Sequence, residues 1–121
     1  MSSNFMLLNN TKKTIDYINK QLINYPKSER VLKDNIERNM YEIIELIFYY
    51  SINTLDRIKE KYLKDLIVKL SMLDFYIEAS YNKKLINKKK MMSISMFIIE
   101  IRKIVYEIIR NDKVRRITWY R

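Results

Sequence analysis

The chain has 121 residues, with no glycine, cysteine or histidine, a single proline and a net charge of +10. The missing Cys and His exclude zinc sites, iron–sulfur clusters and Ser-His or Cys-His nucleophiles, and the missing glycine excludes the phosphate loops of nucleotide enzymes. Because turns in sheets normally need glycine, this composition predicts long helices with short connections.

Four segments repeat apolar residues at spacings of three and four, which is the period of an amphipathic helix. We expect helices at about 5–24, 27–52, 56–81 and 88–111, followed by a basic tail at 112–121. Pro26 separates the first two helices, Thr54 or Asp56 is expected to cap the third, and Asn87 the fourth. Connections this short join antiparallel neighbours, so the predicted fold is all-α, one antiparallel up-down-up-down four-helix bundle.

The predicted core consists of the apolar stripes on these helices. The stripes run from Leu32 to Tyr50 on the second helix, from Leu63 to Ile77 on the third and from Met91 to Ile108 on the fourth. The first stripe consists of Leu8, Thr11, Ile15, Ile18, Leu22 and Tyr25.

Catalysis is not indicated. Glu42 with Glu45, and Asp74 with Glu78, have helical spacing, but neither pair lies on an apolar stripe, so solvated faces explain them better. We expect no enzymatic activity, no metal and no cofactor. The chain has no leader-like start and no uncharged segment long enough to span a bilayer, so a cytoplasmic, soluble protein is expected.

Positive charge is concentrated in the last third of the sequence. Residues 83–121 contain twelve Lys and Arg against three acidic residues, a net charge of +9. Such an excess favours contact with a polyanion. We expect nucleic acid and no membrane partner, because the apolar helix faces are needed for the core.

The candidate nucleic-acid contacts lie in two stretches. Five lysines lie within eight residues at the predicted third turn, where they oppose the helix dipole; facing phosphates would explain them, and a solvated charge run is the alternative. The tail from Lys113 mixes cations with aromatic rings, which suits either base stacking or packing at the end of the fourth helix. The full set is Lys27, Arg30, Lys83, Lys84, Lys88, Lys89, Lys90, Arg102, Lys103, Arg110, Lys113, Arg115, Arg116, Trp119 and Arg121.

Two helices carry more apolar residues than one internal stripe needs. Ile99 and Tyr106 lie together outside the main apolar arc of the fourth helix, and Phe48 and Tyr49 form a similar surplus on the second. These four residues predict an interface between protomers. Scattered surface apolar residues are the alternative.

An ordered set of short motifs resembles a known family. The set comprises the run YPKSER at 25–30 followed by Leu32 and Ile36, the run MYEIIEL at 40–46, the stretch from Ser80 to Lys89, and the run EIRKI at 100–104. In order and spacing it is similar to the accessory variability determinant proteins of diversity-generating retroelements, and to the related proteins encoded by intervening sequences in ribosomal RNA genes. The resemblance covers about residues 11–110.

The resemblance implies a basic, barrel-like homopentamer of four-helix protomers that binds RNA, DNA or their hybrid. It further implies a partner reverse transcriptase, which the protein assists in mutagenic cDNA synthesis without an activity of its own. The alternative is a structural or RNA-associated bundle of the intervening-sequence type, with no polymerase partner.

Overall fold

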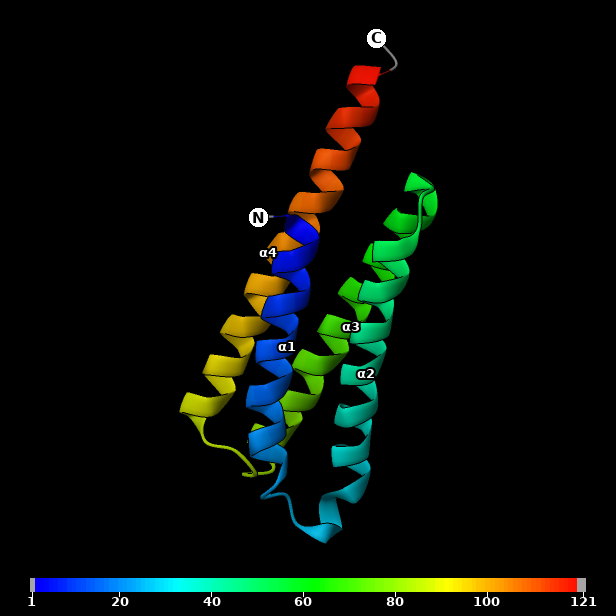
Figure 1. Cartoon of the computed structure of the whole chain (residues 1–121). Coiled ribbons are helices and arrows are strands. Elements are labelled where there is room, and N and C mark those ends of the chain that lie inside the picture. Colours follow the sequence, from blue (N-terminus) through cyan, green and yellow to red (C-terminus); the bar gives the residue numbers. More distant parts are fainter. Residues whose placement is uncertain (1, 120–121) are drawn as a thin grey trace.

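The computed structural model describes the backbone of residues 2–119 and the side chains of residues 2–113. Four helices make up the fold: α1 (Ser3–Leu22), α2 (Arg30–Ile52), α3 (Asp56–Asn82) and α4 (Lys88–Trp119), with a 3₁₀ turn at Lys27–Glu29 before α2. Successive helices run in opposite directions (Figure 1). The described residues contain no strand, and the predicted all-α four-helix bundle is confirmed.

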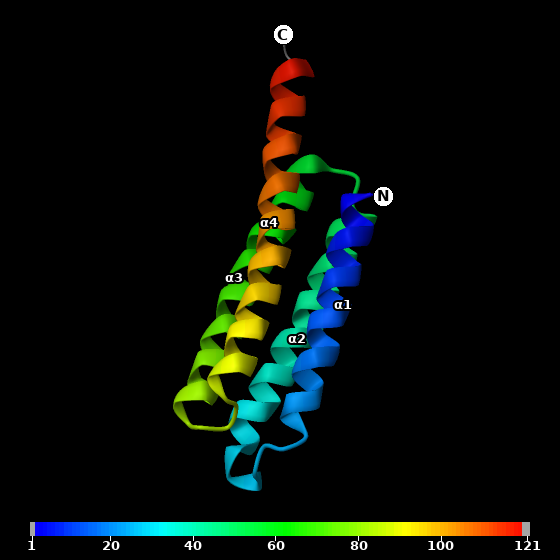
Figure 2. The same ribbon diagram turned by 90° about the vertical axis from the view of Figure 1, so that its left-hand side faces the viewer.

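Each helix packs against two neighbours. Both α1 and α3 lie against α2 and α4, while the diagonal pairs make no close backbone approach within the described residues. One apolar core, drawn from all four helices, fills the space between them. Because α4 is the longest helix, its last turns extend beyond the start of α1 in both views (Figures 1 and 2).

The buried positions follow the predicted stripes most closely on α3 and α4. All five predicted residues from Leu63 to Ile77 are buried, as are those of α4 from Ile94 onward, while Met91 is partly buried. On α1 the buried face is rotated: Leu7 is fully buried, and Leu8 and Ile15 are only partly covered. A helix with two neighbours buries a broad arc, so an apolar residue at the edge of a predicted stripe can be either fully or only partly buried.

Two predicted helix starts and one predicted cap differ from the observed ones. α1 begins at Ser3 because the Ser2 hydroxyl accepts a hydrogen bond from the Phe5 N–H at 3.2 Å. The predicted start of the second helix at residue 27 is instead the 3₁₀ turn, which follows the extended backbone of Pro26. The cap expected at Thr54 or Asp56 is wrong, since Leu55 occupies the N-cap position and makes no side-chain cap bond.

The fourth helix starts as predicted and ends later. Asn87 caps it, because its Oδ1 accepts the N–H of Lys90 at 2.8 Å. The helix continues to Trp119. The prediction of a separate tail from residue 112 is therefore wrong, because the backbone of 112–119 is helical. Residues 112–119 contain neither glycine nor proline, and nothing in them ends a helix.

The connection from α3 to α4 closes without a glycine. After Asn82 the N–H of Lys84 donates to the Tyr81 carbonyl, and that of Leu85 to the Ser80 carbonyl, both at 2.9 Å. This pair of bonds is the Schellman motif, which needs a left-handed residue after the helix. Lys84 adopts that conformation with φ 64°, at a steric cost that glycine would avoid.

Replacing Lys84 with glycine should therefore stabilise the fold. We expect Lys84→Gly to raise the free energy of unfolding by about 1 kcal/mol, measured by urea denaturation followed with circular dichroism. Lys84→Ala is the matched control, since it removes the same charge and keeps the Cβ atom that causes the strain. Equal stabilities of the two variants would contradict this account of the turn.

Candidate nucleic-acid interface

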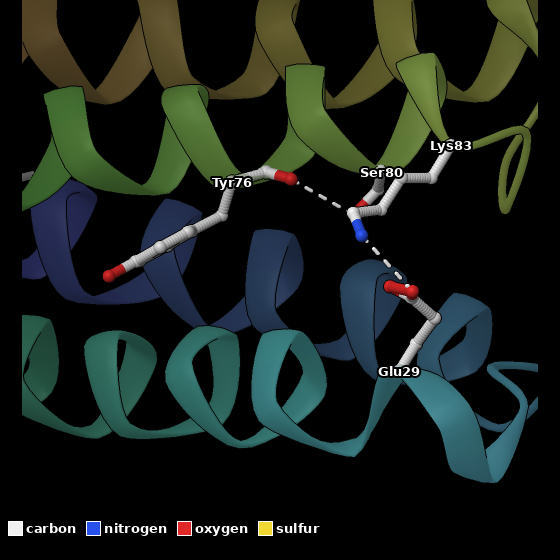
Figure 3. Close-up of polar contacts among 4 residues, drawn as sticks. All are labelled: Glu29, Tyr76, Ser80 and Lys83. Carbon is white, nitrogen blue, oxygen red and sulfur yellow. Dashed lines mark hydrogen bonds and ion pairs between the residues drawn. The ribbon is translucent and has the colours of Figure 1, made fainter.

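The antiparallel order brings the first and third connections to the same end of the bundle, here called the turn end (Figure 1). An ion pair links the two, with Lys83 Nζ at 3.1 Å from Glu29 Oε1 (Figure 3). The same view shows the Ser80 hydroxyl, which donates to the Tyr76 carbonyl at 2.9 Å. Lys27, in the 3₁₀ turn, and Arg30, at the start of α2, therefore lie at the same end as the lysines of the third turn.

A buried tyrosine closes the core at the turn end. Tyr25 is 8 % exposed, and burial raises the pKa of its hydroxyl; the Ser80 side chain acts against this rise and the Glu29 carboxylate adds to it. The phenol is neutral at physiological pH, as an ordinary tyrosine is. It adds no negative charge beside the lysines.

Most predicted cations along the rest of the bundle have acidic or polar partners. Lys103 pairs with Glu100 at 3.5 Å, Arg110 with Glu107 at 3.7 Å, and Lys113 with Glu60 at 3.9 Å. Arg102 donates to the Ser71 hydroxyl at 3.1 Å, across to α3. The three ion pairs offset positive charge on α4 between Lys103 and Lys113.

At the turn end, most cations have no acidic partner among the described residues. Within the described residues only Lys83 of the predicted set at this end has a carboxylate partner. The remaining six cations form no ion pair with any described residue, and we call them the turn-end cluster: Lys27, Arg30, Lys84, Lys88, Lys89 and Lys90. A polyanion that contacts this cluster displaces no internal ion pair.

The position of three of these lysines on α4 adds to the local positive potential. Lys88, Lys89 and Lys90 form its first turn, where the helix dipole is positive. Each cation at this end is unfavourable by about 0.3–1 kcal/mol when exposed. A bound phosphate would remove that repulsion, because it carries the charge that the helix end favours.

The structure does not bring the predicted contacts into one site. From Lys88 to Lys113, α4 rises by about 38 Å at 1.5 Å per residue, so the two basic stretches lie at opposite ends of the bundle. The side chains of Arg115, Arg116 and Trp119, and all of Arg121, lie outside the described residues. Their predicted role stays a prediction.

The four predicted interface residues are exposed but lie on two separate faces. Ile99 and Tyr106 are 40 % and 53 % exposed and are seven residues apart on one side of α4. Phe48 and Tyr49 are on α2, which makes no close approach to α4 within the described residues. Tyr49 also stacks on Tyr62 of α3, with ring centroids 5.2 Å apart.

Two of the four carboxylates noted above for their helical spacing have structural contacts. Glu42 pairs with Lys69, and Asp74 accepts a hydrogen bond from Ser95 at 3.3 Å. Nowhere in the described part of the chain do three carboxylates gather in a way that could hold a metal ion.

Sequence reasoning missed two features of this region. One is the pairing of the α4 cations, which the spacing Glu100–Lys103 and Glu107–Arg110 could have indicated. The other is a hollow beside the turn-end cluster, lined in part by Tyr81 and Asn82. No pattern in the sequence indicated it, since its shape depends on how the third turn folds.

Comparisons with known proteins give no family assignment, because no protein-family model and no curated protein matches the chain. None of the helices, over the described residues, has both the length and the apolar character needed to cross a bilayer.

Proposed function

We propose that the chain is a non-catalytic nucleic-acid-binding protein whose main contact surface is the turn-end cluster. The observation that carries this proposal is the distribution of ion pairs. Lys103, Arg110 and Lys113 of α4 pair with Glu100, Glu107 and Glu60, whereas the six cations of the turn-end cluster pair with no described residue. Lysine neutralises phosphate as a point charge and reads no base. Binding is therefore electrostatic and tolerant of sequence.

We further propose that the protein serves as the accessory protein of a diversity-generating retroelement and assists its reverse transcriptase in mutagenic cDNA synthesis. The ordered motifs from residue 25 to residue 104 support this, together with the basic turn end. Co-purification with the reverse transcriptase encoded beside it tests the partnership. A tagged chain that recovers nucleic acid but no polymerase would favour the alternative of an RNA-associated bundle.

The turn-end lysines should dominate the salt dependence of binding. We expect replacement of Lys88, Lys89 and Lys90 by glutamine to weaken binding to all oligonucleotide sequences alike. The slope of log K against log salt should fall by about 2, because three phosphate contacts are lost. Fluorescence anisotropy titrations at several salt concentrations measure both quantities.

The matched control removes the same charge from the paired cations. Replacing Lys103, Arg110 and Lys113 by glutamine lowers the net charge by the same amount as the turn-end triple, and we expect a much smaller change in slope. If the two triple variants lose affinity equally, only the total charge matters and the turn end is not the site.

We also propose that the chain forms a homo-oligomer, a pentamer by its family resemblance, through the exposed apolar residues of α2 and α4. Ile99→Glu or Tyr106→Glu should weaken association by about tenfold or more, because a carboxylate would replace an apolar contact in the interface. Light scattering measures the mass, and circular dichroism checks that helicity is kept.

Val31→Glu is the control, since Val31 is 74 % exposed in the first turn of α2, where an acidic residue suits the helix dipole. A monomeric wild-type chain at micromolar concentration would contradict the proposal.

A further inference from the structure

The third turn forms one side of a hollow of about 570 Å³. Its lining comes from the last turn of α3, from the connection and from the first turn of α4. The volume lies within the range of sites that hold drug-sized molecules. A nucleotide is of that size.

The lining residues divide by exposure. Tyr81 and Leu85 are partly buried and Ile86 is only 6 % exposed, so the inner part of the hollow is aromatic and aliphatic. The more exposed members are polar: the amides Asn82 and Asn87 and the ammonium group of Lys84, joined by the half-buried Lys90.

The polar groups have hydrogen-bonding capacity left over. Asn87 uses its Oδ1 to cap α4, which leaves its amide N–H groups free to donate to a ligand. Neither Lys84 nor Lys90 forms an ion pair with a described residue, as noted for the turn-end cluster. The hollow therefore offers an apolar surface, amide groups and two positive charges within one space.

This combination limits the ligand. An inorganic phosphate would use the lysines and leave the apolar part empty. A duplex keeps its bases stacked inside and presents mainly phosphates to a protein of this kind. An unpaired nucleotide has a flat apolar face for Tyr81, polar base edges for the amides and a phosphate for the lysines.

We propose that this hollow binds an unpaired nucleotide of a single-stranded nucleic acid, with the base against Tyr81 and its phosphate between Lys84 and Lys90. The inference rests on the proposed nucleic-acid binding and adds to it that the turn end selects single strands by contact with a base. Such contact is sequence-tolerant, because every base has a stacking face.

The test separates base contact from phosphate contact in the wild-type protein. The probes are a fluorescently labelled single-stranded DNA and an abasic chain with the same number of phosphates. We expect the abasic chain to bind about tenfold more weakly at equal salt, because it keeps the charge and lacks the stacking surface.

Variants then assign the base contact to the hollow. Tyr81→Leu should bind DNA as weakly as the wild-type protein binds the abasic chain, while its affinity for the abasic chain stays unchanged. Tyr81→Phe keeps the ring and should behave as wild type. Lys88→Gln, outside the lining, should weaken both probes by the same factor. Circular dichroism checks that each variant is folded. The comparison of the two probes on the wild-type protein does not depend on the variants.

Each other outcome overturns the inference in a recognisable way. Equal affinities for DNA and the abasic chain would mean that the lysines bind phosphates alone, with the proposed function intact. A preference for DNA that survives in Tyr81→Leu would place the base elsewhere. Failure of both probes to bind would refute the proposed function together with the inference.

Discussion

Short connections make each helix of the bundle antiparallel to the one before, and the properties of the turn end depend on this constraint. Two connections that are more than fifty residues apart in the sequence lie at one end, where Lys83 of the third turn reaches Glu29 of the first. The same geometry places the lysines that precede and begin α4 at the same end as Lys27 of the 3₁₀ turn and Arg30 at the start of α2. The apolar core keeps this order, since each helix must bury its stripe against two neighbours.

Ion pairing divides the positive charge of the protein into two kinds. On α4 between Lys103 and Lys113, acidic residues one turn away or on α3 offset the cations. These ion pairs are exposed and contribute little to stability. The six cations of the turn-end cluster have no such partner among the described residues, and three of them lie in the first turn of α4, where the helix dipole is positive. Lys84 also occupies a left-handed position that glycine would fill at lower cost. The proposed contact with phosphates would offset this local cost.

The helices, their order and most of the core could be predicted from the sequence, because the three-four spacing of apolar residues is a local pattern that one helix displays by itself. Residues from Leu63 to Ile77 illustrate this. The rotated face of α1 could not be predicted, since whether Leu7 or Leu8 is buried depends on where α2 and α4 lie. The candidate site was predicted only as a set of charges. Which cations are offset depends on distances across the fold, such as that from Lys113 to Glu60. The hollow depends on the conformation of the third turn, and no sequence pattern predicts the left-handed backbone of Lys84.

Lysine acetylation read by mass spectrometry, with and without a saturating single-stranded oligonucleotide, tests most directly whether the turn end is the contact surface. Each lysine reports its own protection, and all are compared in one wild-type sample. The account predicts strong protection of Lys84, Lys88, Lys89 and Lys90, with Lys103 acetylated equally in both samples. Protection of Lys103 and Lys113, with turn-end lysines that react as fast as in the free protein, would contradict it.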